Sequence, residues 1–426
     1  MVNYNELARS SKSASFKTAN LKSETRDNAL RLISEALTAH KSEIFAQNQL
    51  DLINAKAENL PQPIVNRLKF DDHKLTDILS GIESLLGLPD PLFNILLERE
   101  LDDGLNLIKT TCPIGVIGVI FESRPDALIQ ISTLCVKSGN ACILKGGSEA
   151  ANTNKILFEI IKEAGLNAGM PDGFISLVET RQGIDELLKC HKYIDLLIPR
   201  GSNAFVQYIM ANSKIPVMGH ADGICHIYID KDADISKAVP IAVDAKTQYV
   251  AACNTVETLL VHEDIADIFL PKLAEDLKSK NVLVKGCNNT QKYIECQNAT
   301  EQDFETEYLD YIISIKIVSG LDEAIEHINA YGSHHTDCIV TENNQAATEF
   351  MNFVDSAGVY QNCSTRFADG FRYGFGAEVG ISTGKLHARG PVGLEGLITY
   401  KYKLFGNGHI VSDYADGKKS FHFKDK

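Results

Sequence analysis

Hydrophobic positions in the first hundred residues recur at the spacing of amphipathic helices. In the stretch 24–40, Leu30, Ile33 and Leu37 lie three or four residues apart, and charged residues occupy positions between them. Side chains with this spacing share one face of a helix. We therefore predict a mostly helical N-terminal region whose apolar faces pack on a core.

From residue 115 onward, short apolar runs alternate with helical segments. Continuous apolar strands separated by helices are typical of parallel sheets that are covered on both faces. The pattern predicts an α/β protein with two lobes that carry parallel sheets, and a boundary near residue 245. The runs are GVIGVIF (115–121), ACILK (141–145), FISLVET (174–180) and IDLLIP (194–199), and a second series starts with TVETLLVH (255–262).

The segment ITYKYKLF (398–405) alternates apolar and polar residues. This alternation is typical of a strand with one exposed face. Such a strand can pair with the sheet edge of another subunit or fold back on its own lobe. We expect it to form a small oligomerisation element of a homo-oligomer, and the sequence leaves the folded-back arrangement open.

Composition and charge narrow the class of protein. The 426 residues are 44% hydrophobic and 23% charged, as in a folded protein with more than one core. The formal net charge of -14 argues against a nucleic-acid partner, because phosphate backbones are bound by clustered Lys and Arg. No apolar run approaches the ~20 residues that cross a bilayer, and no apolar signal segment follows Met1. We expect a cytoplasmic protein without a membrane partner.

The ten cysteines contain no C-x-x-C pair and no spacing typical of a zinc site, so we predict no bound metal. Cys253 lies between a predicted helix (233–247) and a predicted strand, where a side chain can face a cleft. A nucleophilic cysteine needs a cation or a helix N-terminus nearby to lower the pKa of its thiol. By position alone, Cys253 is only slightly favoured over the other nine.

One segment has the character of a phosphate-binding loop, although the dinucleotide fingerprint G-x-G-x-x-G is absent. In NACILKGGSEA (140–150), a buried strand ends at Lys145, and Gly146 and Gly147 precede Ser148 at the start of a helix. Free N–H groups at a helix N-terminus favour a phosphate, and glycines let the backbone approach it. The alternative is a capped helix with a solvated lysine.

The segment LLIPRGSNAF (196–205) repeats this order with Arg200, Gly201 and Ser202. Two such loops in one lobe strengthen the prediction of a phosphate-containing ligand.

Other candidate residues carry weaker signals. His334 and His335 are adjacent, so their side chains diverge and cannot share a metal; we interpret them as core or surface residues. Arg366 lies in a glycine-rich segment, where it could grip a carboxylate or form a structural ion pair.

Several blocks taken together resemble the gamma-glutamyl phosphate reductase family of the aldehyde dehydrogenase superfamily, nearly end to end. The resemblance implies an aldehyde dehydrogenase-like fold. It implies an NADPH-binding domain with a helical N-terminal region over 1–245, a catalytic domain over 246–385, and a C-terminal return with an oligomerisation segment over 386–426. The blocks are PIGVIGVIFESRPD (113–126), SGNACILKGGSEA (138–150), IDLLIPRGSN (194–203), GHADGICHIYID (219–230), CNTVETLLVH (253–262) and FRYGFGAEVGISTGKLHARGPVGLEGL (371–397).

The resemblance also implies the chemistry. Cys253 would attack the acyl phosphate of glutamate, expel phosphate and form a thioester, which hydride from NADPH would reduce. Backbone N–H groups near Cys253 and the side chain of Ser123 would stabilise the oxyanion. Lys145 and Ser148 fall where the superfamily holds the adenosine ribose, and serine instead of glutamate there favours NADPH.

Further roles follow from the same resemblance. Arg124, Asn254 and Arg366 are the expected substrate-binding residues, and a separate glutamate kinase would supply the acyl phosphate. The stretch VMGHADGICH (217–226) lacks the glutamate with which hydrolytic aldehyde dehydrogenases activate water, whereas TQYVAAC (247–253) departs from the Arg-Pro-rich approach of many reductases. The alternatives are reduction of another acyl phosphate, hydrolytic aldehyde oxidation, or a non-catalytic nucleotide-binding subunit.

Overall fold

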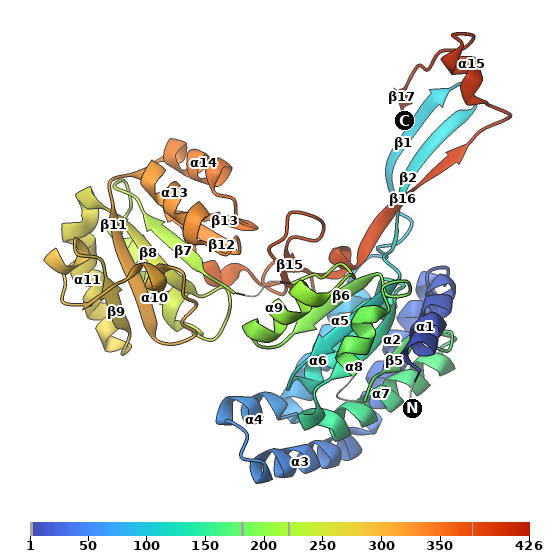
Figure 1. The fold of residues 1–426 in the computed structure, drawn as a ribbon, viewed down its shortest axis with the longest axis horizontal. Coiled ribbons are helices and arrows are strands. Elements are labelled where there is room, and N and C mark those ends of the chain that lie inside the picture. Colours follow the sequence, from blue (N-terminus) through green and yellow to red (C-terminus); the bar gives the residue numbers. More distant parts are fainter. Residues whose placement is uncertain (1–2, 180–182, 220–221, 377) are drawn as a thin grey trace. The chain divides into compact units, whose positions relative to one another are not determined.

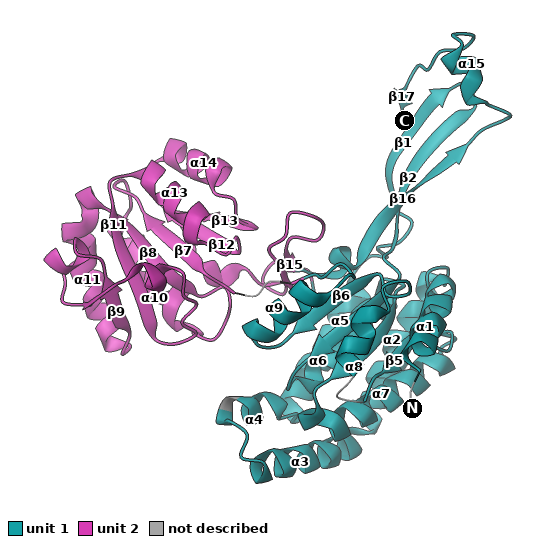
Figure 2. Ribbon diagram, viewed as in Figure 1, with its two compact units in different colours: residues 1–218, 376–380, 392–426 teal, residues 219–375, 381–391 magenta. Residues whose placement is uncertain are grey.

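The computed structural model describes residues 3–179, 183–219, 222–376 and 378–426 (Figure 1). They form two compact units, shown in Figure 2. Unit 1 comprises 1–218, 376–380 and 392–426, and unit 2 comprises 219–375 and 381–391. The boundary expected at residue 245 falls inside unit 2, because β7 (Cys225–Ile229) pairs with β8 (Val256–His262) in the second sheet.

The N-terminal region of unit 1 is helical, as predicted. Helix α2 buries Leu30, Ile33 and Leu37, which confirms the apolar face expected over 24–40. These side chains are fully buried, so the spacing of apolar residues reports packing in this region. The helices are α1 (Tyr4–Thr18), α2 (Ser23–Ala39), α3 (Lys41–Ala57), α4 (Gln62–Leu68) and α5 (Asp72–Gly87).

A parallel sheet in the order β5-β4-β3-β6 forms the centre of unit 1. Every residue of β3 and β4 is buried, which explains why these strands are continuous apolar runs in the sequence. The strands are β3 (Val116–Phe121), β4 (Ala141–Gly146), β5 (Ile175–Leu177) and β6 (Leu196–Arg200), and the helices are α6 (Pro125–Lys137), α7 (Ala151–Asn167), α8 (Gly183–Lys189) and α9 (Asn203–Asn212).

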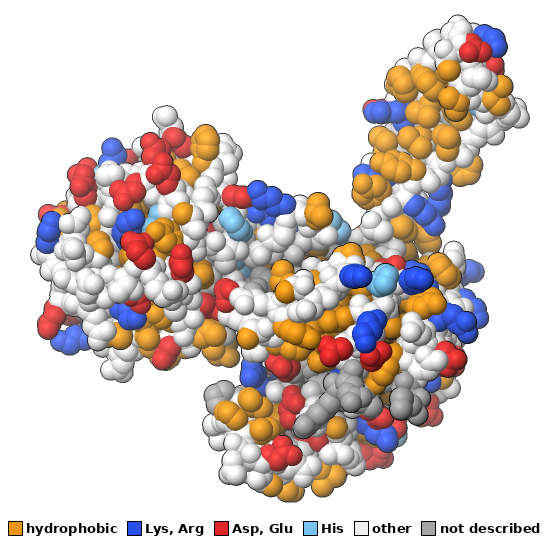
Figure 3. Space-filling view, viewed as in Figure 1, with side chains coloured by type: hydrophobic (Ala, Val, Ile, Leu, Met, Phe, Trp, Pro, Cys, Tyr) orange, Lys and Arg blue, Asp and Glu red, His pale blue; other side chains and the backbone are white. Residues whose placement is uncertain are grey.

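Unit 1 also contains an antiparallel sheet in the order β16-β2-β1-β17. Strand β16 has the predicted bounds, Ile398–Phe405, and pairs with β2 (Leu105–Pro113) of the same chain. The prediction of one exposed face is wrong, because every residue of β16 after Ile398 is exposed. Figure 3 shows apolar side chains gathered over this sheet. The remaining strands of the sheet are β1 (Ile95–Asp102) and β17 (Lys424–Asp425).

Unit 2 is built on a parallel sheet in the order β10-β9-β11-β8-β7-β12-β13. Buried Ile, Leu and Val side chains of the central strands pack against the helices in its core. The strands not yet located are β9 (Leu283–Gly286), β10 (Gln297–Asn298), β11 (Ile312–Val318), β12 (Thr336–Val340) and β13 (Gly358–Gln361), and a short sheet pairs β14 (Gly380–Ser382) with β15 (Gly390–Val392). The helices are α10 (Ile235–Thr247), α11 (Ala266–Ser279), α12 (Glu301–Phe304), α13 (Leu321–Tyr331) and α14 (Asn344–Phe353), and α15 (Val411–Ala415) belongs to unit 1.

The turn that carries Cys253 is bracketed by a buried ion pair. Lys246, near the end of α10, lies 2.6 Å from Glu257, near the start of β8, and neither side chain is exposed. Burial lowers the pKa of Lys246 and raises the pKa of Glu257 to about 7. Removing one partner from such a pair costs about 3–5 kcal/mol, so the pair ties the two ends of the turn together.

None of the described helices is both long enough and apolar enough to cross a membrane. The whole α/β architecture, with its parallel sheets, confirms the predicted fold class.

Candidate active site

The predicted nucleophile lies at the amino edge of the sheet in unit 2. Cys253 is half-buried in the turn before β8, and His335 directly precedes β12. The strands run parallel in the order β8-β7-β12, so their amino ends lie along the same edge of the sheet. The topology therefore brings together two side chains that are 82 residues apart in sequence.

The ring of His335 connects Cys253 to Thr336. Its Nε2 lies 3.2 Å from Cys253 Sγ, and its Nδ1 lies 2.9 Å from Thr336 Oγ1. The imidazole is fully buried, so these contacts fix its orientation. When Nδ1–H donates to the Thr336 hydroxyl, Nε2 is left as the acceptor for the thiol proton. The pair is arranged for proton transfer from sulfur to imidazole.

The sequence analysis interpreted His335 only as a core or surface residue. The two adjacent histidines do point in different directions, since His334 Nδ1 lies 2.7 Å from the carbonyl oxygen of Asp355. The one signal in the sequence that could have indicated the contact with Cys253 is the position of His335. It directly precedes an apolar strand, and the turn with Cys253 directly precedes another. The sequence does not reveal that these two strands are separated only by β7.

The backbone of Cys253 is closely packed. Its carbonyl accepts a hydrogen bond from Cys225 Sγ at 3.4 Å, and a Cβ on Gly223 would overlap its backbone. Within the turn, Thr255 N–H donates to the carbonyl of Ala252 at 2.9 Å. These contacts fix the position of the predicted nucleophile within the turn.

Arg366 supplies a cation near the thiol. The residue is 8% exposed, and its Nε donates to Gln248 Oε1 at 2.9 Å. Burial and the charge of Arg372 lower the pKa of Arg366, whereas the charge of Cys253 opposes that shift. A cation within electrostatic range of a thiol favours the thiolate.

Asn254 anchors the same turn. Its Nδ2 donates to the carbonyl of Ala368 at 2.8 Å, and its buried Oδ1 has no hydrogen-bond partner among the described residues. Arg366 and Asn254 thus both lie in the Cys253 region of unit 2, whereas Ser123 and Arg124 belong to unit 1.

Ser123 sits in the turn between β3 and α6 with a positive φ of 51°. Its backbone N–H and its hydroxyl donate to Glu149 Oε1, at 2.6 and 2.9 Å. Its hydroxyl proton is therefore engaged by a carboxylate in this structure. Arg124 Nη2 lies 2.8 Å from Asp126; burial opposes ionisation of Asp126, but the charges of Arg124 and Lys74 outweigh it and lower the pKa of that carboxyl.

The first predicted phosphate loop has the expected layout. Lys145 is the penultimate residue of β4, which extends one residue further than predicted, to Gly146, and Lys145 is 5% exposed; burial lowers the pKa of its ammonium, and the charge of Glu149 opposes this shift. Ser148 starts a short 3-10 helix and makes no side-chain capping bond to it. A Cβ on Gly146 would overlap Asn154, and one on Gly147 would overlap the carboxylate of Glu149. Both glycines leave space that protein side chains occupy here.

The second loop is also closed by a carboxylate. Glu122 Oε2 accepts from Ser202 N–H at 3.1 Å and from the Ser202 hydroxyl at 3.5 Å, at the start of α9. A Cβ on Gly201 would approach the same carboxylate, and the Arg200 side chain lies against Gly380. Two adjacent residues of one turn, Glu122 and Ser123, therefore connect to the two predicted phosphate loops.

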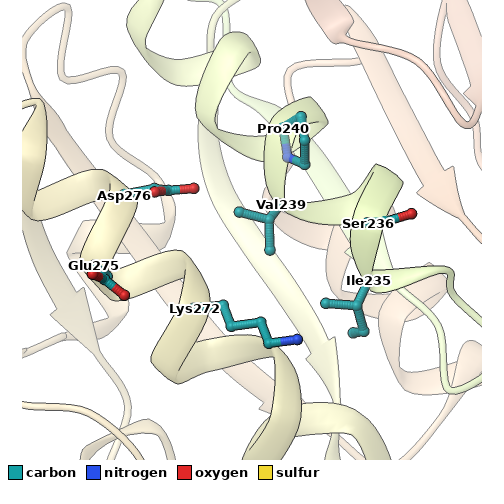
Figure 4. Close-up of a pocket in the computed structure, with 7 residues that line it drawn as sticks. All are labelled: Ile235, Ser236, Val239, Pro240, Lys272, Glu275 and Asp276. Atoms are coloured by element: carbon teal, nitrogen blue, oxygen red, sulfur yellow. The ribbon is translucent and has the colours of Figure 1, made fainter.

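A groove of about 490 Å³ lies on another part of unit 2 (Figure 4). It involves the amino-terminal half of α10, whereas Cys253 follows the carboxyl end of that helix. We assign it no part in the chemistry of Cys253. Its lining residues are Ile235, Ser236, Val239, Pro240, Lys272, Glu275 and Asp276.

Known proteins resemble this chain over its whole length. The family model described as "Aldehyde dehydrogenase family" matches residues 2–291. The gamma-glutamyl phosphate reductase of Pelotomaculum thermopropionicum is 60% identical over 420 residues, which cover 99% of this chain and 97% of the relative. Gamma-glutamyl phosphate reductase 1 of Synechocystis is 55% identical over 416 residues, which cover 97% and 96%. The crystal structure of a gamma-glutamyl phosphate reductase from Thermotoga maritima superposes with a TM-score of 0.93 at 40% identity, covering 95% of this chain and 99% of that one.

Proposed function

Because the chain belongs to the aldehyde dehydrogenase family, and within it to the gamma-glutamyl phosphate reductases, we propose that it reduces gamma-glutamyl phosphate to glutamate 5-semialdehyde and phosphate. This reaction is the second step of proline biosynthesis. The identity of 55–60% over the full length confirms the resemblance inferred from the sequence blocks. The observation that carries the mechanism is the 3.2 Å separation of Cys253 Sγ and His335 Nε2.

The first step is capture of the acyl group by sulfur. His335 accepts the thiol proton at Nε2, and the thiolate of Cys253 attacks the acyl carbon. A carbon–sulfur bond forms, the carbon–oxygen bond to phosphate breaks, and the proton on His335 passes to the departing phosphate. The product on the enzyme is a thioester of Cys253.

The second step discharges the thioester. The chemistry that bound NADPH would supply here is donation of a hydride to the thioester carbon. The resulting thiohemiacetal oxyanion on Cys253 expels sulfur, which releases the aldehyde and restores the thiolate. No water needs activation in this sequence, in keeping with the absence of a glutamate in the stretch 217–226. Residues 220–221 of that stretch lie outside the described part of the chain.

Cations and dipoles oppose the negative charge that these steps develop. Arg366 lies near Cys253 and can attract the substrate carboxylate or the leaving phosphate, and Arg124 is the second proposed anion ligand. Asn254 shares the Cys253 turn and is the third proposed substrate ligand. Ser123 can serve as an oxyanion donor only after its hydroxyl is released from Glu149.

The features of unit 1 fit a nicotinamide dinucleotide. Lys145 is a buried cation at the end of a strand, and the exposed Ser148 follows it at the start of a helical segment. Arg200, Gly201 and Ser202 repeat the arrangement at the end of the next but one strand. The serine at position 148 carries no charge that would repel a 2′-phosphate, which supports NADPH over NADH, whereas the neighbouring Glu149 places a carboxylate in the same loop.

The reverse reaction tests the proposal directly. The protein should oxidise glutamate 5-semialdehyde with NADP, and the rate should depend strictly on added phosphate. Oxidation without phosphate would instead indicate a hydrolytic aldehyde dehydrogenase, and a preference for another semialdehyde would indicate a different acyl phosphate. Loss of turnover in Cys253→Ala separates these enzymes from a non-catalytic nucleotide-binding subunit.

We propose that a second copy of the chain covers the antiparallel sheet of unit 1. Tyr400, Tyr402 and Leu404 alternate along β16 and are 49%, 58% and 57% exposed, so they form an apolar stripe. Contiguous exposed apolar side chains of this kind mark contact surfaces. Tyr402→Glu should therefore yield smaller particles than the unaltered protein by light scattering coupled to size exclusion. Unchanged particle mass would contradict the assignment.

Acyl phosphates are labile, so we also propose that the protein associates transiently with the glutamate kinase that makes its substrate. Equal flux through the two enzymes when they are separated by a membrane permeable to small molecules would contradict it.

A further inference from the structure

The proposed dinucleotide site of unit 1 has one unusual feature, which is a carboxylate inside the first predicted phosphate loop. Glu149 Oε1 accepts two hydrogen bonds from Ser123, one from the backbone N–H at 2.6 Å and one from the hydroxyl at 2.9 Å. Ser123 is only 4% exposed, so both donors are directed into the protein. A backbone N–H and a hydroxyl that converge on one oxygen are the donor set that proteins use for a phosphate oxygen.

The surroundings of Glu149 point to the same interpretation. Its carboxylate lies where a Cβ on Gly147 would be, so the side chain folds back over the glycine pair. The buried cation Lys145 interacts electrostatically with it. An internal anion thus occupies the space beside Gly147 where a bound phosphate was expected, within electrostatic range of Lys145.

Glu149 and the residue that it contacts come from two different strand ends. Lys145 lies in β4 and Glu149 follows that strand, whereas Ser123 follows β3. The contact therefore ties the phosphate loop to the segment that carries the proposed oxyanion donor. While the contact persists, neither donor of Ser123 is available to another anion.

We propose that Glu149 is an exchangeable internal anion: a phosphate group of the dinucleotide takes its place at the backbone N–H of Ser123, close enough to Lys145 to feel its charge, and leaves the Ser123 hydroxyl free. The inference rests on the proposed dinucleotide site and adds a residue that sets cofactor affinity. Release of Glu149 also frees the Ser123 hydroxyl, so cofactor binding prepares the oxyanion donor for the substrate. Glu149 is a positioning residue in this scheme and does not contact the reacting atoms.

The proposal predicts an unusual direction for a loop substitution. Glu149→Gln keeps the size of the side chain but removes the competing charge, so it should bind NADPH tighter by about fivefold or more in isothermal titration calorimetry. Glu163→Gln removes an exposed charge further along α7 and should leave the Kd unchanged. Titration with NADH distinguishes the phosphate involved: a gain with both dinucleotides indicates the pyrophosphate, and a gain with NADPH alone indicates the 2′-phosphate.

Ser123→Ala provides an independent variant that weakens the same contact, because it removes the hydroxyl hydrogen bond to Glu149 and keeps the one from the backbone N–H. It should also tighten NADPH binding, and the double variant should gain less than the sum of the two single gains, since both remove one interaction. Unchanged or weaker NADPH binding in both single variants would overturn the proposal. It would show that the contact between Glu149 and Ser123 is a fixed structural contact. Absence of NADPH binding by the unaltered protein would instead refute the dinucleotide site itself.

Discussion

His335 Nε2 lies 3.2 Å from Cys253 Sγ at the amino edge of the unit 2 sheet. The two residues come from turns that precede two strands, β8 and β12, on either side of β7. The relationship distinguishes the proposed nucleophile from other cysteines of the chain: Cys253 has a buried imidazole and a nearby guanidinium, whereas five of the other nine are buried in the protein interior.

Removal of the imidazole should weaken the nucleophile. His335→Gln should lower kcat by about 100-fold or more, since general base catalysis typically contributes this much. It should also slow alkylation of Cys253 by iodoacetamide near neutral pH, because the thiol loses its proton acceptor. His334→Gln is the matched control: its ring contacts the carbonyl of Asp355 and should leave both rates unchanged. Equal alkylation rates in the two variants would show that His335 does not activate the thiol.

The hydroxyl of Thr336 should matter through His335 alone. Thr336→Val keeps the shape of the side chain but leaves Nδ1 of a buried imidazole without its partner, which should lower kcat/KM about tenfold. It should also move the pH profile, because the contact selects the tautomer that accepts the thiol proton. Thr336→Ser should restore both. Failure of serine to restore them would assign the loss to packing.

Gly223 should tolerate no side chain. A Cβ at this position would overlap the backbone of Cys253, which cannot move without displacing the nucleophile. Gly223→Ala should therefore lower kcat and destabilise the fold by about 1–3 kcal/mol, measured by urea unfolding. Gly81→Ala in α5 has no atom within 4 Å of the new Cβ and should stabilise the fold slightly. A fully active Gly223→Ala variant would contradict the close packing of the turn.

His327 should make the fold sensitive to mild acid. Burial, and then the nearby His226 and Lys316, lower the pKa of His327 to about 2. The folded protein therefore keeps this ring neutral, whereas the unfolded chain binds a proton below pH ~6.5. Stability is complete above that pH and falls as pH drops toward the folded pKa. Between pH 7.5 and 5.0 the loss should be about 2 kcal/mol from this group.

The control for this prediction is His327→Gln, compared with the unaltered protein by urea unfolding at both pH values. The variant should lose about 2 kcal/mol less stability on acidification, whatever its stability at neutral pH. An equal acid loss in the two proteins would show that His327 titrates normally in the fold.

The local pattern of apolar and polar residues predicted many of the helices and strands, because it reflects which side chains are buried. The spacing of Leu30, Ile33 and Leu37 predicted α2, and continuous apolar runs predicted β3 and β4, since both features follow from which side of an element faces a core. Strand β16 was predicted at its observed bounds, but the exposure of both faces was not. Alternation in the sequence does not show that a sheet lacks a covering layer.

Relationships between distant segments could not be predicted in this way. The pairing of His335 with Cys253 depends on the strand order β8-β7-β12, and apolar runs carry no information on order. The same holds for Glu149 and Ser123, whose contact depends on the folding back of a side chain over Gly147. The residue types in the loops were enough to select these residues as candidates. Their contacts could be identified only from the fold.

The central claim is that Cys253 receives the acyl group before hydride transfer. The most direct measurement is peptide mass spectrometry after a rapid acid quench, with gamma-glutamyl phosphate generated by a glutamate kinase and NADPH omitted. Acid keeps the α-amino group of the bound glutamyl group protonated, so it cannot attack the thioester. We predict a glutamyl group on the peptide that contains Cys253, and its disappearance when NADPH is added before the quench. An unmodified Cys253 peptide from protein that still oxidises NADPH with this substrate would contradict the account.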